Sequence, residues 1–389
     1  MKSTETTLIM RKIFNCAMVN ARSWCSGVTF QSCRSMSFRS PEDNPAKQVF
    51  QHEGLLYKVP QDEVSKIFPV GYSRKWYTLS QIFRDANIMI RRPALEVIDY
   101  LKKSNFKQSA VRYVLYGNRG SGKTLSLMHI MHYCYTQGWM IVHIPNANDW
   151  NVNNRFDFLD SVSHEGMYDQ PVFSAEWLKQ FKSRNELSLS RLKTHEKYTW
   201  SKRECTDANQ PLISVIDQGL NRPKNATDVI GVLLKELKEH SFSDSFKMLY
   251  AVKAVNGLFA ERTNIRKPGG YMIPVRELTM CMHFRKFLNA NWKNGAIVTT
   301  VDQHNSYKEM KADYKPLYLL KQEGFEVMDP FIPVKVDNYS EKEFESMMQY
   351  LLDKKWIQNE KICTESGMQE LKFLSSLNPG AVQRICFSL

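Results

Sequence analysis

The residue types most suited to chemistry in this sequence lie together at positions 117–124, which read GNRGSGKT. Gly117, Gly122, Lys123 and Thr124 have the spacing of a P-loop. In such a loop the glycines let backbone N–H groups face phosphate oxygens, the lysine supplies a positive charge, and the hydroxyl binds Mg²⁺. The predicted contacts to the phosphates of a nucleoside diphosphate or triphosphate are Gly117, Asn118, Arg119, Gly120, Ser121, Gly122, Lys123 and Thr124, with Thr124 also a ligand of Mg²⁺.

The elements expected around this loop fit that role. Residues 111–116 form a β-branched and aromatic run that predicts a buried strand ending directly on the loop. Apolar residues then recur at helical spacing over 124–137, and Gly138 follows where a helix ends. Residues 139–144 predict a second strand. The helix start would add its dipole to phosphate binding.

Further patterns predict the fold class. Residues 248–252 and 296–301 are candidate buried strands, and amphipathic patterns predict helices over 93–102, 225–240 and 274–289. Asn225, with Asp228 three residues later, is a candidate N-cap for the second of these helices. The alternation predicts an α/β fold, a P-loop NTPase with a parallel sheet flanked by helices.

The last part of the chain differs from the rest because it predicts only helices. Ser340 and Glu343 have the spacing of a capping box, and further helical segments follow around Leu371 and after Pro379. We therefore predict four parts: a presequence over 1–40, an N-terminal extension over 41–110, a P-loop nucleotide-binding domain over 111–335, and a small helical C-terminal subdomain over 336–389.

Hydrolysis of the nucleotide has weaker support than binding. A P-loop enzyme ends a second strand with an aspartate that holds Mg²⁺, but the candidate strand 248–252 is followed by Lys253, which cannot bind the ion. Asp302, after the strand 296–301, is either a polar sensor near the γ-phosphate or a solvated loop carboxylate. No catalytic residue is predicted. The sequence has no Asn-Lys-x-Asp motif, so residue patterns alone do not choose between GTP and ATP.

Charge and composition point to a mitochondrial, polyanion-binding protein. The chain of 389 residues has a net charge of +13, with 53 basic and 40 acidic residues. Residues 1–40 are rich in serine and have six basic residues, Lys2, Arg11, Lys12, Arg22, Arg34 and Arg39, against one acid, Glu5. This composition predicts a mitochondrial presequence; the alternative is a disordered tail. Removing its +5 leaves about +8 on the remainder.

A second basic segment runs from Lys182 to Arg203, where basic residues are interleaved with Tyr198 and Trp200. This combination can grip phosphates and stack on bases, which would suit RNA. The alternative is a solvated helix with a few aromatic anchors in the core. The mitochondrial destination and the surplus of positive charge favour RNA or a ribonucleoprotein surface.

Other features exclude some functional classes. The eight cysteines, Cys16, Cys25, Cys33, Cys134, Cys205, Cys281, Cys363 and Cys386, form no CxxC pair, so neither a cysteine-based zinc site within this chain nor a thioredoxin-type motif is indicated. A metal or cluster site shared with a partner stays open. No run of about 18 apolar residues is present, and we expect a soluble protein without a membrane partner.

Several strings also resemble one family. The P-loop, HIPNANDW at 143–150, NATDVIGVLLKELK at 225–238, NGAIV at 294–298 and DPFIPVKVDNYSEKEFES at 329–346 are similar to the death-associated protein 3 family. Members of that family are GTP-binding proteins of the mitochondrial ribosome's small subunit. The resemblance extends from about residue 50 to the C-terminus.

The resemblance implies an AAA-like P-loop fold, GTP or GDP with Mg²⁺ as ligands, and a matrix location on the ribosome. The implied partners are small-subunit ribosomal proteins and rRNA, with intersubunit contacts to the large subunit. Asn338 and Tyr339 are implied at the base side of the nucleotide. The family pattern has an aspartate where this chain has Lys253, so GTP hydrolysis is expected to be weak or absent.

The expected function is therefore a structural component of the mitochondrial small ribosomal subunit that binds guanine nucleotide and supports mitochondrial translation. One alternative is an AAA-type NTPase switch, which would need an acidic Mg²⁺ ligand. Another is an apoptosis signalling adaptor, which rests on family association alone.

Overall fold

The computed structural model describes residues 38–68, 73–152, 157–243, 246–267, 269–304 and 311–387. All of these residues lie in the larger of the chain's two units, Ser37–Leu389. The predicted presequence therefore lies almost wholly outside the described residues. Its last residues, 38–40, belong to the larger unit, where Ser40 N–H donates to the Leu56 carbonyl at 2.8 Å. The other predicted boundaries, at 111 and 336, stay predictions.

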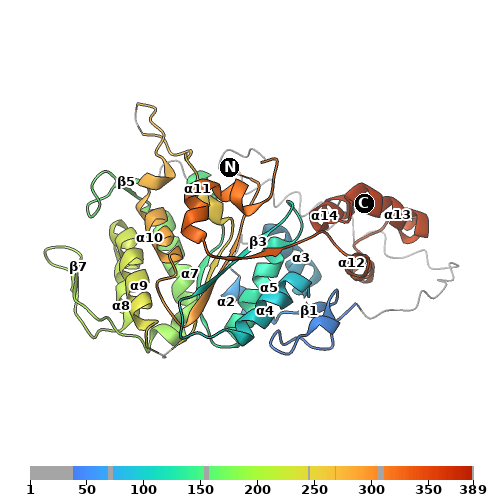
Figure 1. Ribbon diagram of the computed structural model, residues 1–389, viewed down its shortest axis with the longest axis horizontal. Helices are drawn as coiled ribbons and strands as arrows, with labels where there is room; N and C mark the ends of the chain where they lie inside the picture. The colour runs from blue at the N-terminus through green and yellow to red at the C-terminus, as the bar shows by residue number, and fades with distance from the viewer. Residues whose placement is uncertain are drawn as a thin grey trace, which may run out of the picture. The chain divides into compact units, whose positions relative to one another are not determined.

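A five-stranded parallel sheet forms the centre of the larger unit, in the order β11-β3-β10-β9-β4 (Figure 1). The strands are β3 (Val111–Tyr116), β4 (Met140–Ile144), β9 (Met248–Val252), β10 (Gly295–Thr300) and β11 (Ile332–Lys335). Because all five run in the same direction, their carboxyl ends meet at one edge, where ligands of open α/β sheets bind. The predicted α/β fold with a parallel sheet flanked by helices is confirmed.

Alternate residues of each strand pack on opposite faces of the sheet. In β9, Leu249 and Ala251 join one apolar cluster, while Tyr250 and its alternate neighbours join the other. The first face is covered by α4 (Arg92–Lys103), α5 (Lys123–Thr136) and the N-terminal helices α2 (Gln61–Ile67) and α3 (Arg74–Phe83). The strands are therefore buried on both sides, as their continuous apolar runs require.

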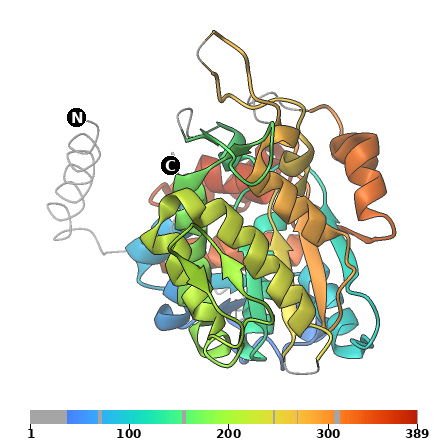
Figure 2. The ribbon, with the colours of Figure 1, turned by 90° about the vertical axis from the view of Figure 1, so that its left-hand side faces the viewer.

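The opposite face is covered by α7 (Pro171–Leu189), α8 (Leu212–Asn221), α9 (Ala226–His240) and α10 (Thr279–Leu288). Figure 2 shows α8 and α9, in yellow-green, over this face. The helix α11 (Pro316–Met328) adds Leu319, Leu320 and Met328 to the same cluster. Two short antiparallel ribbons accompany these helices: β5 (Leu159–Asp160) with β6 (Tyr168–Asp169) precedes α7, and β7 (Tyr198–Thr199) with β8 (Cys205–Thr206) lies between α7 and α8 in the sequence.

The C-terminal helices pack against the N-terminal segment. After β11 come α12 (Glu341–Asp353), α13 (Glu365–Ser375) and α14 (Pro379–Cys386), drawn in red in Figure 1. Their apolar cluster includes Leu56 of β1 (Leu56–Lys58) and Met89 of β2 (Asn87–Met89), which form an antiparallel ribbon. The first and last parts of the described chain thus meet beside the sheet.

Most predicted elements are confirmed, with two corrections. The capping box of α12 forms in full, since the Ser340 hydroxyl accepts from the N–H of Glu343 and the Glu343 carboxylate accepts from that of Ser340. In contrast, Asn225 ends a short 3-10 turn and makes no side-chain cap for α9. The helix predicted from 274 begins only at Thr279, because the extended backbone at Leu278 separates it from the turn Val275–Glu277.

Among the described residues, none of the helices has the length and apolar character needed to cross a membrane. The burial of four cysteines is described. Cys134, Cys281 and Cys386 are buried, whereas Cys205 in β8 is exposed.

Candidate nucleotide site at the carboxyl end of the sheet

The predicted phosphate loop lies between β3 and α5, at the edge where the parallel strands end. Its three glycines, Gly117, Gly120 and Gly122, have φ values of 148°, 85° and 104°, which residues with a side chain rarely adopt. Gly122 is the N-cap of α5, and no side chain caps this helix. The N-terminal N–H groups of a helix and its dipole favour anions, so the loop has the backbone form that phosphate binding needs.

Lys123 is held at the centre of this loop. Its ammonium donates to the carbonyls of Gly117 at 2.6 Å and Asn118 at 2.9 Å, and the side chain is largely buried. Burial lowers the pKa of Lys123 to about 8, while the negative charge of Asp302 opposes this shift. A phosphate group beside the ammonium would stabilise its charged form and raise the pKa again.

The C-terminal helices close on the loop from outside. The N–H of Gly380 donates to the Gly120 carbonyl at 2.9 Å, and the side-chain amide of Asn378 donates to the Arg119 carbonyl at 3.0 Å. A Cβ atom at Gly120 would lie 2.5 Å from Asn378 Oδ1, and one at Gly117 would lie 2.3 Å from the carbonyl oxygen of Val336. A side chain at either glycine would therefore clash with its neighbours, in addition to the strain from the positive φ.

A buried arginine connects the loop to both ends of the described chain. Arg91, only 5% exposed, donates from Nε and Nη2 to the Glu343 carboxylate at 2.9 and 3.0 Å. Its Nη1 donates to the Ser121 carbonyl, and its Nη2 also donates to the carbonyls of Asp337 and Asn338. The sequence gives no signal for this role of Arg91, which reads only as a basic residue before Arg92 and Pro93 at the start of α4.

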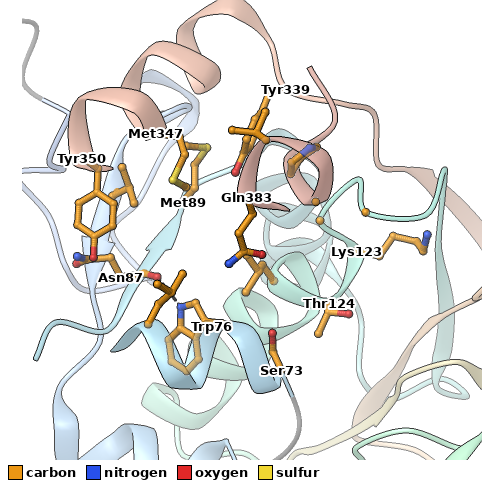
Figure 3. A pocket seen from close by; sticks show the side chains of 18 of the residues that line it. Ser73, Trp76, Asn87, Met89, Lys123, Thr124, Tyr339, Met347, Tyr350 and Gln383 are labelled. Atoms are coloured by element: carbon orange, nitrogen blue, oxygen red, sulfur yellow. Dashed lines mark hydrogen bonds between the residues drawn. The ribbon is translucent and has the colours of Figure 1, made fainter. Parts of the chain in front are cut away.

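A cavity of about 270 Å³ opens beside the loop, between the N-terminal segment and the C-terminal helices. Figure 3 shows Lys123 and Thr124 on one side of it and a group of apolar and aromatic side chains on the other. Its lining includes the loop residues Arg119, Gly120, Gly122, Lys123 and Thr124, and the apolar side chains of Trp76, Met89, Tyr339, Met347 and Tyr350. The cavity thus combines a phosphate-binding part with a part suited to a planar base.

Not all predicted residues line this cavity. Asn118 is exposed at the start of the loop, and Gly117 and Ser121 are buried behind it. Of the two residues implied at the base side, Tyr339 lines the cavity under the guanidinium of Arg91, at 5.2 Å from the ring centre. Asn338 instead donates to the Ser376 carbonyl at 3.0 Å and does not line it.

Two neighbouring strands end beside the loop with different charges. Lys253 follows β9, and burial lowers its pKa, with the charges of Asp302 and Asp149 opposing the shift. Asp302 follows β10 and lines the cavity with Thr124. The Asp302 N–H donates to Asn256 Oδ1 at 2.9 Å, and the Asn256 side-chain amide donates to the Asp302 carbonyl at 3.0 Å. These two bonds fix the Asp302 backbone. Asp302 is therefore part of the cavity wall rather than a wholly solvated loop residue.

The oxygen donors in this wall fit the predicted metal. The Thr124 hydroxyl and the Asp302 carboxylate both line the cavity, and Mg²⁺ prefers oxygen ligands with several waters retained. The side chain at the end of β9 is an ammonium group, which repels a cation. A phosphate-bound Mg²⁺ in this cavity would therefore be held by Thr124 and Asp302 and not by the residue that follows β9.

A family model described as mitochondrial ribosomal death-associated protein 3 matches residues 88–385, which include the loop and all five strands of the sheet. The chain belongs to this family. The resemblance inferred from the P-loop and the four other strings is thereby confirmed. The matched range also includes Arg91, Lys253 and the C-terminal contacts to the loop.

Relatives cover most of the chain. The protein named small ribosomal subunit protein mS29 from Bos taurus is 45% identical over 348 residues, which are 90% of this chain and 87% of that protein. The protein of the same name from Mus musculus is 44% identical over 351 residues, 90% of this chain and 89% of that protein. The solved structure of Cdc6p from Pyrobaculum aerophilum matches with a TM-score of 0.32 and 12% identity over 76% of this chain and 54% of that chain, too distant for any conclusion.

The basic segment of this family member is less open to RNA than its sequence indicates. Tyr198 donates its hydroxyl to Glu236 at 2.6 Å, and Trp200 donates its indole N–H to Thr206 at 2.9 Å, so both aromatic rings are tied to the fold. Arg184 is buried, and Lys197 pairs with Asp207 at 2.9 Å. The exposed basic residues that still suit a polyanion are Arg191, Lys193, Lys202 and Arg203.

Proposed function

We propose that this protein is a structural component of the mitochondrial small ribosomal subunit, located in the matrix, that supports mitochondrial translation. The observation that carries this proposal is membership of the mitochondrial ribosomal death-associated protein 3 family, together with 45% identity to a relative named small ribosomal subunit protein mS29. We further propose that the chain contacts small-subunit proteins and rRNA and takes part in contacts to the large subunit.

The proposed ligand is GTP or GDP with Mg²⁺. The phosphates would lie against the loop N–H groups and Lys123, and Thr124 would contribute its hydroxyl to the metal. The base would lie in the apolar part of the cavity, where Trp76 and Tyr350 offer aromatic rings. The side-chain amides of Asn87 and Gln383 line the same cavity and can both donate and accept hydrogen bonds at a base edge.

The proposed role of the nucleotide is structural. Its phosphates would contact a loop that is bonded to α14 and, through Arg91, to the start of α12. A ligand that binds only this folded arrangement stabilises it by mass action. With Lys253 at the end of β9, turnover is expected to be slow. Multiple-turnover hydrolysis faster than about 1 s⁻¹, within the usual range for enzymes, would contradict this role.

Sedimentation tests the proposed assembly. Mitochondrial lysate is separated on a sucrose gradient at moderate salt, and the chain is followed by immunoblotting. We expect it to migrate with small subunits and with whole ribosomes. Migration at the position of a free protein would reject the ribosomal proposal, whatever the outcome for the nucleotide.

A further inference from the structure

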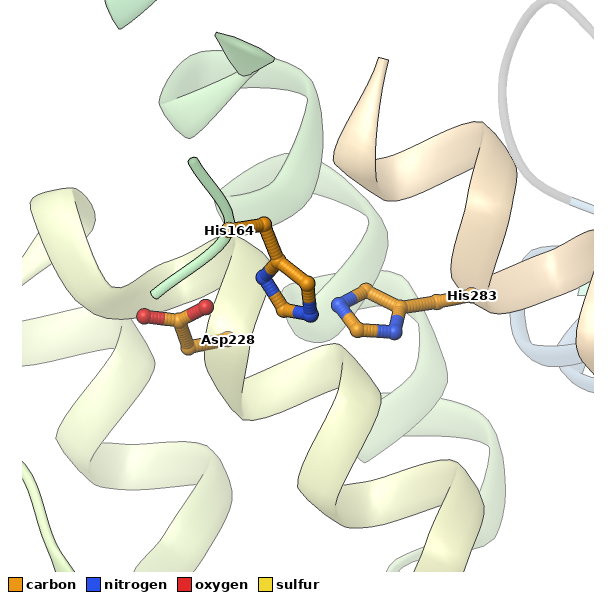
Figure 4. Close-up of side chains that lie close together, drawn as sticks. All are labelled: His164, Asp228 and His283. Carbon is orange, nitrogen blue, oxygen red and sulfur yellow. The ribbon is translucent and has the colours of Figure 1, made fainter. Parts of the chain in front are cut away.

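A second cluster of polar side chains lies on the other face of the sheet, away from the phosphate loop. His164 lies in the turn between β5 and β6, Asp228 in the first turn of α9, and His283 on α10. One donor atom of each residue lies within 4.8 Å of a donor atom of the other two. Figure 4 shows the His164 ring between the Asp228 carboxylate and the His283 ring. Three separate elements thus direct polar groups to one point.

This cluster has buried polar atoms without hydrogen bonds. Among the described residues, His164 Nδ1, Asp228 Oδ1 and His283 Nε2 are buried and have no hydrogen-bond partner. Leaving a buried polar atom without a hydrogen bond destabilises the fold, so three such atoms in one cluster indicate a ligand that pairs with them. Two imidazoles and a carboxylate are a donor set that suits Zn²⁺.

The surroundings prepare the three side chains for a metal. The Ser163 hydroxyl donates to Asp228 Oδ2 at 2.7 Å, which orients the carboxylate as outer contacts do in metal sites. Burial lowers the pKa of His283 to about 3, and a neutral imidazole is the form that binds metals.

The His283 ring packs against Gly231, where any side chain would occupy its position. A Cβ atom at Gly231, one turn after Asp228 on α9, would lie 2.4 Å from Cε1 of the His283 ring. The glycine lets the ring approach the helix that contributes the carboxylate. Donors around a tetrahedral Zn²⁺ stand about 3.4 Å apart, so side-chain shifts of about 1 Å would complete the site.

A second histidine cluster provides an internal comparison. His195, Glu236 and His240 also bring donors within 4.8 Å of one another. There, His195 Nδ1 lies 2.6 Å from the Glu236 carboxylate, and His240 Nε2 lies 2.7 Å from the Lys193 carbonyl. These groups already have protein partners, so this cluster does not require a metal.

We propose that His164, Asp228 and His283 bind a Zn²⁺ ion that joins the turn between β5 and β6 to α9 and α10, with a fourth position open to water. Each histidine contributes one ring nitrogen and Asp228 one carboxylate oxygen. The site is separate from the phosphate loop, and its existence does not depend on nucleotide binding.

Zinc titration of the full chain tests this proposal. The chain is first treated with a chelator, and Zn²⁺ is then added in competition with a chromophoric zinc indicator. We expect one ion per chain with a Kd below about 1 μM. His164→Ala and His283→Ala should each weaken binding at least thirtyfold, while Asp228→Asn, which keeps the side-chain size, should weaken it at least tenfold. His195→Ala serves as the matched control and should leave this ion bound.

Two further measurements make the result decisive. Co²⁺ in the wild-type site should give the strong visible absorption of a four- or five-coordinate ion, and this should be lost in Asp228→Asn. Circular dichroism identifies any variant that fails to fold, and Lys123→Ala should retain zinc. The proposal is overturned if the wild-type chain holds no ion more tightly than about 10 μM. It is also overturned if only His195→Ala or His240→Ala removes the ion, or if an ordered water alone fills the site.

Discussion

The loop after β3 and the end of β9 lie at the same edge of the sheet but are equipped for different tasks. After β3, left-handed glycines, Lys123 and Thr124 provide the parts of a phosphate site. At the end of β9, the side chain is the partly buried ammonium of Lys253. P-loop enzymes place an Mg²⁺-binding carboxylate on such a strand. We propose from this difference that nucleotide binding and hydrolysis are separable in this chain, and that it keeps only the parts for binding.

The loop differs from the end of β9 also in its connections. Gly380 and Asn378 bond to its carbonyls from α14, and Arg91 joins Ser121 to Glu343 at the start of α12. The loop and the C-terminal helices are thus one packed structure. By linkage, a nucleotide bound to this arrangement also stabilises the helices.

The largest expected effect comes from removing Arg91, the side chain that connects the loop to α12. Arg91→Ala would leave the buried Glu343 carboxylate without its partner, which costs about 3–5 kcal/mol. Urea unfolding should show a fall of this size in the free energy of unfolding. Arg92→Ala is the matched control, because Arg92 is largely exposed beside Glu53 and should change stability by less than about 1 kcal/mol. Equal small effects would show that Arg91 does not connect the loop to α12.

The second prediction separates backbone strain from packing in the loop. Gly120→Ala should cost about 1–3 kcal/mol for its positive φ and a further ~1–3 kcal/mol for the clash with Asn378. Gly138→Ala has a φ of 73° and open space around the new Cβ, so it should show the strain cost alone. Thermal unfolding of both variants measures the difference. If the two variants lose the same stability, α14 does not close tightly on the loop.

The third prediction concerns the phosphate charge directly. Lys123→Ala should lower the affinity for guanine nucleotide at least tenfold, about 1.4 kcal/mol, because it removes the ammonium at the centre of the loop. Calorimetry with GDP and Mg²⁺ measures the change. Lys103→Ala, which removes an exposed lysine paired with Asp99, controls for loss of charge in general. An unchanged affinity in Lys123→Ala would contradict the proposal that this loop binds the phosphates.

The smallest expected effect is a dependence on pH. Because the pKa of Lys123 is lowered to about 8, its charged fraction falls by about fourfold from pH 7 to pH 8.5. Bound phosphate favours the charged form, so binding takes up a proton and the nucleotide Kd should rise about fourfold over this range. Lys123→Arg keeps its charge over this range, so its nucleotide Kd should not change with pH. A flat profile in the wild-type chain would contradict the lowered pKa.

Local patterns predicted the elements around the loop well, for physical reasons. The runs 111–116 and 248–252 became β3 and β9 without change, because both are short and rich in apolar residues whose central positions are buried in the sheet. The edge strand β11 was not predicted because Pro333 argues against a strand, although proline is tolerated at an edge. The start of α10 was misplaced because apolar spacing does not reveal the extended backbone at Leu278.

The rest of the site depends on contacts between distant parts of the chain. Arg91 and Glu343 are separated by 252 positions, and no local pattern connects them. Met89 and Met347 likewise come from opposite ends of the described chain to line one cavity. The sequence favours RNA or a ribonucleoprotein surface for the basic segment because it does not show that Glu236 holds Tyr198. Tertiary contacts, which a single sequence does not display, decide these points.

The most direct test of nucleotide binding without turnover is the identity of the ligand released from the protein. The chain is purified with its small subunits, denatured, and its nucleotide separated by chromatography. We expect about one guanine nucleotide per chain, unchanged in amount after hours in buffer, and its loss in Lys123→Ala. Absence of guanine nucleotide in the wild-type protein, or its rapid exchange and hydrolysis, would contradict a nucleotide that serves as a fixed part of the structure.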